Sequence, residues 1–128
     1  PRSGLRPLVS DIPELTWNGT RILGTAQQTG TAGHVEVIAQ QVQRMAQSGE
    51  YEYITLNRSW KVTTGLEEAS GLRPDIIGVR RNGLVDAYEV ASRTDIEAHL
   101  LERLEEGLKT LRARNRGNVG VLPSVGGR

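Results

Sequence analysis

Two carboxylates near the middle of the chain have the types and spacing of a divalent-cation site. Asp75 follows Pro74 at the start of one apolar run, and Glu89 lies within a second apolar run further along the chain. The Asn82-Gly83 step between the two runs is typical of a β-hairpin. Carboxylate oxygens are ligands that Mg²⁺ and Mn²⁺ prefer. The open end of this hairpin is therefore the candidate metal site.

The register of the hairpin decides whether the two carboxylates meet. A two-residue turn at Asn82-Gly83 would leave Glu89 pointing to the face opposite Asp75. A three-residue loop that includes Arg81, with Gly83 in the left-handed conformation, would instead place Asp75 directly opposite Glu89. Directly opposed residues have Cβ atoms roughly 4.5–5.5 Å apart, so both carboxylates could then bind one ion. We therefore expect the three-residue loop.

The bulk composition excludes several classes of protein. With 128 residues and 37% hydrophobic residues, the chain can build one domain around one core. The absence of cysteine excludes a disulfide scaffold and a thiolate zinc site, and suits a protein that works in a reducing cytoplasm. No apolar run is long enough for a membrane span. Because the net charge is only +1, any affinity for nucleic acid must come from local patches.

The first half of the chain predicts a linker followed by a helix and a strand. Residues 1–33 are rich in Pro, Gly, Thr and Gln and begin without Met, so we expect a linker-like piece of a larger protein with a short hairpin at Asn18-Gly19. Apolar residues at three- and four-residue steps predict a helix from His34 to Gln47. Residues 51–56 are predicted to form a strand, and residues 60–63 either a continuation of that strand or a second short strand.

The second half completes an α/β fold. Thr94 and Glu97 match a capping box, which predicts a helix that carries a leucine stripe as far as Leu111. A last strand is expected at residues 118–122, followed by a frayed tail at 124–128. The resulting order of helix, strand, strand, strand, helix and strand predicts a mixed sheet flanked by helices, within a domain spanning residues 34–123.

This order of elements, with Pro-Asp opening one strand and Glu-Val-x-Ser in the next, resembles the PD-(D/E)xK nuclease superfamily over roughly residues 34 to 122. The resemblance implies a restriction-endonuclease-like α-β-β-β-α-β core. It also implies a Mg²⁺ or Mn²⁺ ion held by Asp75, Glu89 and, from the first helix, Glu36. In that family a lysine two residues after the glutamate positions or activates water, and here this position is Ala91.

Ala91 has neither a charge nor a proton to give, so this chain lacks the group that would orient or activate the attacking water. Three explanations stay open. Ala91 could be an engineered replacement of lysine that silences a toxic enzyme. A basic residue elsewhere, with Lys61 and Arg93 as the nearest candidates, could supply the charge. The domain could also be a binding relic of the fold.

The resemblance implies hydrolysis of a phosphodiester, with DNA as the expected substrate, by water bound to the metal. Basic residues that flank the proposed site in sequence are the candidate phosphate contacts: Arg58, Lys61, Arg73, Arg80, Arg81 and Arg93. The chain also resembles the carboxy-terminal toxin domain of a polymorphic toxin of the Rhs-repeat or contact-dependent inhibition type. That likeness implies delivery within a larger bacterial toxin, action in the cytoplasm of a target cell and a cognate immunity protein. The alternatives are a non-catalytic nucleic-acid-binding or protein-interaction module, and a metal-independent ribonuclease toxin.

Each candidate residue also has a plain structural interpretation. Asp75 could be a turn residue and Glu36 a solvated or capping one. Glu89 lies between two apolar side chains in a strand, where a buried glutamate is costly unless it is paired or metal-bound. The two carboxylates together therefore favour the metal site. His34 and His99 are too few for a histidine-metal nuclease, and we interpret both as structural.

Overall fold

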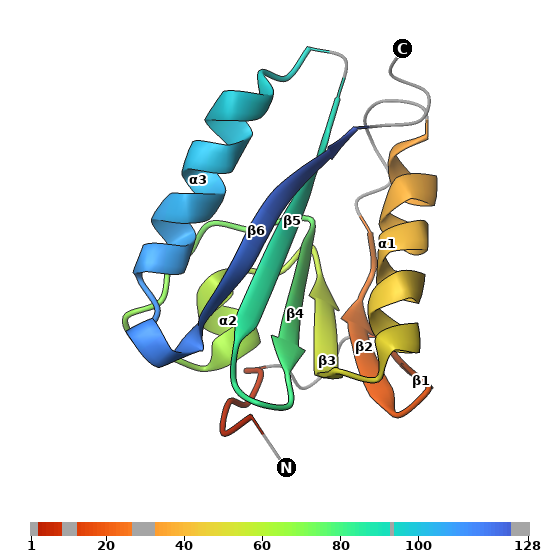
Figure 1. Ribbon diagram of the computed structural model, residues 1–128, viewed down its shortest axis with the longest axis vertical. Helices are drawn as coiled ribbons and strands as arrows, with labels where there is room; N and C mark the ends of the chain where they lie inside the picture. Colours follow the sequence, from red (N-terminus) through yellow and green to blue (C-terminus); the bar gives the residue numbers. More distant parts are fainter. Residues whose placement is uncertain (1–2, 9–12, 27–32, 93, 124–128) are drawn as a thin grey trace.

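The computed structural model describes residues 3–8, 13–26, 33–92 and 94–123 of the chain. They form an α/β domain built on one six-stranded mixed sheet (Figure 1). The prediction of an α/β fold with a mixed sheet is confirmed. Arg93 and the tail at residues 124–128, to which the sequence assigned roles, lie outside the described residues.

The strands follow one another across the sheet in chain order. Neighbouring strands are antiparallel except for the pairs β2–β3 and β5–β6, which are parallel. Each parallel pair needs a crossover connection, and a helix supplies it in both cases. The strands are β1 (Glu14–Trp17), β2 (Thr20–Gly24), β3 (Tyr51–Leu56), β4 (Ile76–Arg80), β5 (Val85–Ala91) and β6 (Arg116–Pro123).

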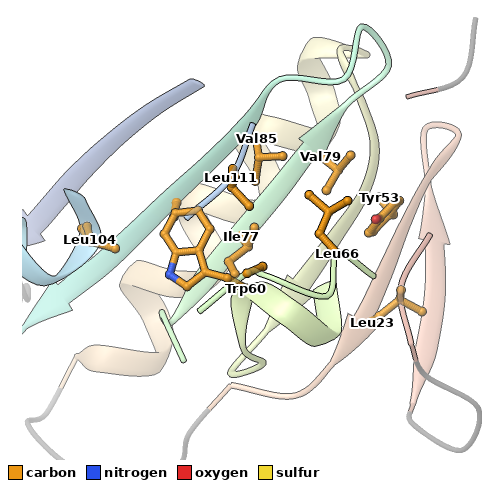
Figure 2. Packing of buried hydrophobic residues seen from close by; sticks show 11 residues of the cluster. Leu23, Tyr53, Trp60, Leu66, Ile77, Val79, Val85, Leu104 and Leu111 are labelled. Atoms are coloured by element: carbon orange, nitrogen blue, oxygen red, sulfur yellow. The ribbon is translucent and has the colours of Figure 1, made fainter. Parts of the chain in front are cut away.

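Helices cover both faces of the sheet, which divides the core in two. The helix α1 (His34–Ser48) packs on one face, and α2 (Trp60–Thr64) and α3 (Glu97–Lys109) pack on the other (Figure 1). A short 3₁₀ turn, η1 (Ala113–Asn115), joins α3 to β6. Figure 2 shows the cluster beneath α2 and α3, with the indole of Trp60 among aliphatic side chains of the sheet and of α3.

The first helix forms as its apolar spacing predicts. Its buried residues include Ile38, Val42 and Met45, which recur on one helical face. Gly33 and Gly49 bracket it, both in the left-handed conformation, so the helix begins at His34 as expected and ends one residue beyond the expected Gln47.

The segment at residues 60–63 was predicted to be a strand, and this prediction is wrong. It forms α2, because Ser59 caps the helix by accepting a hydrogen bond from the Val62 N–H at 3.0 Å, and Gly65 ends it. Val62 and Thr63 are β-branched residues that favour strands. The cap and the complete burial of Trp60 against the sheet outweigh that preference.

The capping box predicted before α3 does not form. The residue before the helix is Ile96, which makes no side-chain cap, and Asp95 instead accepts a hydrogen bond from the Ser92 N–H at 2.8 Å. The leucine stripe is only partly in the core. Leu100, Leu104 and Leu111 are buried, whereas Ile96 and Leu101 are exposed.

The hairpin expected at Asn18-Gly19 is present, with both residues at positive φ. It is, however, part of the main sheet, because β2 pairs with β3 and Leu23 belongs to the core cluster that also contains Trp60. The expected boundary between residues 33 and 34 therefore does not separate the hairpin from the rest of the domain. Within the described ranges, none of the helices has the length and apolar character needed to cross a membrane.

Candidate functional site

The β4–β5 hairpin has the three-residue loop that a shared carboxylate site requires. Val79 pairs with Val85 across it, and the Arg80 N–H donates a hydrogen bond to the Leu84 carbonyl at 2.8 Å. Gly83 has a φ of 93°, the left-handed conformation expected of the residue beside the bulge. The predicted register is confirmed.

This register brings Asp75 and Glu89 together at the open end of the hairpin. The Asp75 N–H donates to Glu89 Oε1 at 3.0 Å, and the Val90 N–H donates to Asp75 Oδ2 at 2.8 Å. Asp75 is only 9% exposed. The backbone of each strand thus holds the carboxylate that belongs to the other strand, which fixes both side chains at one place.

The environment of Glu89 disfavours its negative charge. Burial raises the pKa of Glu89 to about 8, and the neighbouring Asp75 carboxylate acts in the same direction. A hydrogen bond from the Asp75 N–H and the positive charge of Arg103 oppose this shift only in part. At neutral pH Glu89 therefore retains a proton, which a divalent cation bound between the carboxylates would displace.

His34 also belongs to this site, although its sequence position suggested only a structural role. As the first residue of α1, it lies at the end of the sheet, where its Nε2 is 3.6 Å from Asp75 Oδ1. That nitrogen is buried and has no hydrogen-bond partner. Nothing in the sequence spacing connects His34 with Asp75, because only the packing of α1 against the sheet brings them together.

Arg103 is a second residue that sequence reasoning missed. It lies on α3, and both Arg103 and Glu89 line a cavity of about 10 Å³ together with Trp60 and Pro74. Its positive charge lowers the pKa of Glu89, although burial and Asp75 outweigh this effect. The only sequence signal was its place on the polar side of the predicted second helix.

Glu36 is not gathered into the site. It lies on an exposed part of α1, two residues after His34. Among the residues that the structure describes, no three or more His, Cys, Asp or Glu side chains stand close enough to hold a metal ion. The structure therefore brings Asp75, Glu89 and His34 to one end of the hairpin, and leaves Glu36 outside.

Ala91 lies where the register places it, two residues after Glu89 on the same face of β5. It is buried at the end of the strand and pairs with Pro123 of β6. Of the two basic residues considered as substitutes, Lys61 lies 3.7 Å from Glu67, an exposed carboxylate beyond α2. Arg93 lies outside the described residues.

Those arginines proposed to contact phosphate that lie in the described part of the chain have partners within the protein. Arg81 donates to the carbonyls of Gly19 and Gly49, both at 3.1 Å. Arg58 and Arg73 each donate to the Asn57 carbonyl at 3.0 Å. These bonds tie loops to the sheet, so a phosphate would have to compete with them.

Arg80, the last residue of β4, belongs to a separate network around the buried Asp86 of β5. Its Nε lies 2.8 Å from Asp86 Oδ2, and the Tyr51 hydroxyl donates to the same oxygen at 2.5 Å. The Asn118 N–H donates to the other oxygen at 2.8 Å. Burial and the bond to Asp86 raise the pKa of Tyr51 far above its usual range, so its hydroxyl stays a donor. The role of Arg80 in the structure is therefore to neutralise Asp86.

Comparisons of the chain with protein-family models, with curated proteins and with solved structures found no match. The functional argument therefore depends on the geometry and electrostatics of the site.

Proposed function

We propose that this chain is a metal-dependent nuclease domain with a restriction-endonuclease-like core, in which Asp75 and Glu89 hold a Mg²⁺ or Mn²⁺ ion. One observation carries the proposal: two carboxylates converge in a partly buried site, where the pKa of Glu89 is raised to about 8. Such an arrangement destabilises the ionised pair unless a cation neutralises it. A functional ligand is the simplest reason for a protein to keep it.

The topology supports the proposal. The expected core order appears as α1, β3, β4, β5, α3 and β6, with α2 inserted between β3 and β4. The hairpin β1–β2 extends the sheet at the edge away from β6. Asp75 directly precedes β4, and Glu89 lies within β5, so the two carboxylates belong to neighbouring strands in the middle of this core.

In the proposed reaction the chain's own residues hold and orient the reacting groups. A bound divalent cation would supply an activated water at neutral pH and would neutralise charge on the scissile phosphate. Asp75, held by the Val90 N–H, and Glu89, held by the Asp75 N–H, would present oxygens in a fixed geometry. Arg103 stands beside Glu89, where it could contact the phosphate. We propose DNA as the substrate.

The biological setting proposed for this activity is interbacterial competition. The domain would be delivered within a larger toxin into the cytoplasm of a target cell, and an immunity protein would protect the producer. The nuclease proposal does not depend on this setting.

A second candidate is a non-catalytic binding module, and Ala91 favours it. A buried alanine at the end of β5 supplies no group that could orient or activate water. In this case the site would bind a cation without cleaving a phosphodiester.

Restoring the missing lysine separates the two candidates. We expect Ala91→Lys to raise the rate of plasmid cleavage in Mg²⁺ or Mn²⁺ by about 100-fold or more, the usual contribution of a group that transfers or stabilises a proton. EDTA, or Asp75→Ala in the same background, should abolish the gain. Thermal unfolding of each variant controls for folding.

Calorimetry of the unaltered chain completes the test. Binding of Mn²⁺ that is lost in Asp75→Ala, without any cleavage by Ala91→Lys, would identify a binding module. If neither ion binds, or if binding survives Asp75→Ala, the metal site itself is disproved. Cleavage of RNA that persists in EDTA would point to the other alternative, a metal-independent ribonuclease.

A further inference from the structure

His34 brings a buried nitrogen without a hydrogen-bond partner to the carboxylate pair. Its Nε2 is one of three buried side-chain atoms in the described part of the chain that lack a partner. Such an atom is unfavourable, because it has lost its hydrogen bonds to water and has gained none within the fold. A bound group that takes up the lone pair of this nitrogen would remove the cost.

Asp75 is the residue that faces this nitrogen, with Oδ1 3.6 Å from His34 Nε2. The other carboxylate oxygen, Oδ2, accepts a hydrogen bond from the Val90 N–H at 2.8 Å, which holds the Asp75 side chain in place. His34 is held by α1, whose first turn is buried at Val37. The side chains of His34 and Asp75 keep 12% and 11% of their surface exposed, so both reach the surface, and an ion needs only a small side-chain movement to enter between them.

The separation of the two atoms suits a metal ion better than a hydrogen bond or a water. At 3.6 Å it exceeds the roughly 2.7–3.2 Å of a direct hydrogen bond, and a bridging water needs its two partners roughly 4.5 Å apart. Two ligands of a tetrahedral ion, with bonds of about 2.0–2.2 Å, lie roughly 3.3–3.6 Å apart. Neighbouring ligands of an octahedral Mg²⁺ lie only about 2.9 Å apart. The gap therefore fits a tetrahedral ion better than it fits Mg²⁺.

We propose that His34 Nε2 and Asp75 Oδ1 are ligands of one cation, and that the site therefore prefers Zn²⁺ and Co²⁺ to Mg²⁺. Imidazole is a ligand that Zn²⁺ and its neighbours in the transition series accept, whereas Mg²⁺ selects oxygen. Water fills the remaining positions, as it does at other ions held by one or two side chains. This role for His34 rests on the proposed function, in which Asp75 holds the cation, and it names the class of cation.

Calorimetric titration with Zn²⁺, Co²⁺ and Mg²⁺ at pH 7.5 tests this role, with the effect of His34→Gln as the diagnostic quantity, because most protein sites bind Zn²⁺ more tightly than Mg²⁺. We expect His34→Gln to weaken the binding of Zn²⁺ and Co²⁺ about tenfold or more, since even a residue that only orients a metal ligand contributes that much. Mg²⁺ loses no oxygen ligand, so its affinity should change less than about twofold.

The second histidine of the chain provides the matched control. His99 is exposed on α3, so His99→Gln should alter the affinity for none of these ions. NMR of the unaltered chain adds a measurement that does not depend on how a variant folds. Because the sequence contains only two histidines, their imidazole signals can be assigned with His99→Gln. Zn²⁺ should shift the signals of His34 and leave those of His99 in place.

Two results would overturn the role of His34 alone. Equal weakening of Zn²⁺ and Mg²⁺ binding by His34→Gln would mean that His34 only supports Asp75, and binding of Zn²⁺ without a shift of the His34 signals would place the ion elsewhere. In either case, binding of Mn²⁺ that Asp75→Ala abolishes would leave the proposed metal site standing. If none of the ions binds the unaltered chain, the metal site and the role of His34 are both disproved.

Discussion

Asp86 and Glu89 lie three residues apart on β5, and their surroundings differ. Hydrogen-bond donors surround the Asp86 carboxylate, whereas burial and a second carboxylate disfavour the charge of Glu89. Asp86 is fully buried and receives a charged donor from Arg80, a hydroxyl from Tyr51 and a backbone N–H. Glu89 keeps some exposure, and the residue beside it is a second carboxylate, Asp75. Residues three apart in a strand point to opposite faces, so one acid lies on each side of the sheet.

The comparison shows that burial alone does not mark a functional acid. Every polar interaction that Asp86 needs is present in the fold, so its charge stabilises one arrangement of β3, β4, β5 and β6. Burial and the Asp75 carboxylate raise the pKa of Glu89, and the hydrogen bond from the Asp75 N–H does not offset them. A bound cation would neutralise the two carboxylates. The distinction can be tested by removing each acid in turn.

The largest effect is expected from Asp86→Ala. This change leaves the buried Tyr51 hydroxyl and the Arg80 guanidinium without their acceptor, so the free energy of unfolding should fall by about 3–5 kcal/mol. Denaturant unfolding at pH 7 measures it. Asp95→Ala, which removes an exposed carboxylate bonded to one backbone N–H, should lower stability by about 1 kcal/mol or less. Similar losses in both variants would mean that Asp86 does not organise the fold.

The next effect, in the opposite direction, is expected from Glu89→Gln. Because the pKa of Glu89 is about 8 in the folded chain, against 4.5 when unperturbed, folding binds a proton. Its contribution to stability is therefore present below about pH 4.5 and is lost as the pH rises through 8. Glu89→Gln should abolish this decline and should be more stable than the original chain at pH 9, by about 2 kcal/mol because water still reaches the site.

Urea unfolding at a series of pH values checks this prediction. Glu36→Gln, which removes an exposed carboxylate of α1, is the matched control and should keep the original pH profile. Loss of the decline in both variants, or in neither, would show that Glu89 is not the group responsible.

The hairpin that carries both acids was largely predictable, because its signals are local. The Asn82-Gly83 step allowed two registers, and only the loop with a left-handed Gly83 lets Asp75 meet Glu89. The requirement that two carboxylates share a site thus selected the correct register. The apolar spacing of α1 and α3 was local in the same way.

The failures have their cause in tertiary contacts. Residues 60–63 have strand propensity, but the burial of Trp60 and the Ser59 cap make them helical. The proximity of His34 to Asp75 depends on how α1 crosses the sheet, which no spacing along the chain reveals. Charge in the sequence likewise could not distinguish an arginine that is free to bind phosphate from Arg80, which is held by Asp86.

The smallest expected effect is the stabilisation of the folded chain by a bound cation. It separates Glu89 from Asp86 most directly, because it tests whether a cation binds at Glu89. At pH 8, Mn²⁺ at about ten times its dissociation constant should raise the free energy of unfolding by about 1.4 kcal/mol. The stabilisation should shrink toward pH 6, because a proton on Glu89 competes with the ion. It should vanish in Glu89→Gln and persist in Glu36→Gln, as followed by thermal or urea unfolding. A pH-independent stabilisation, or one retained by Glu89→Gln, would place the ion elsewhere and would leave Glu89 without the role that distinguishes it from Asp86.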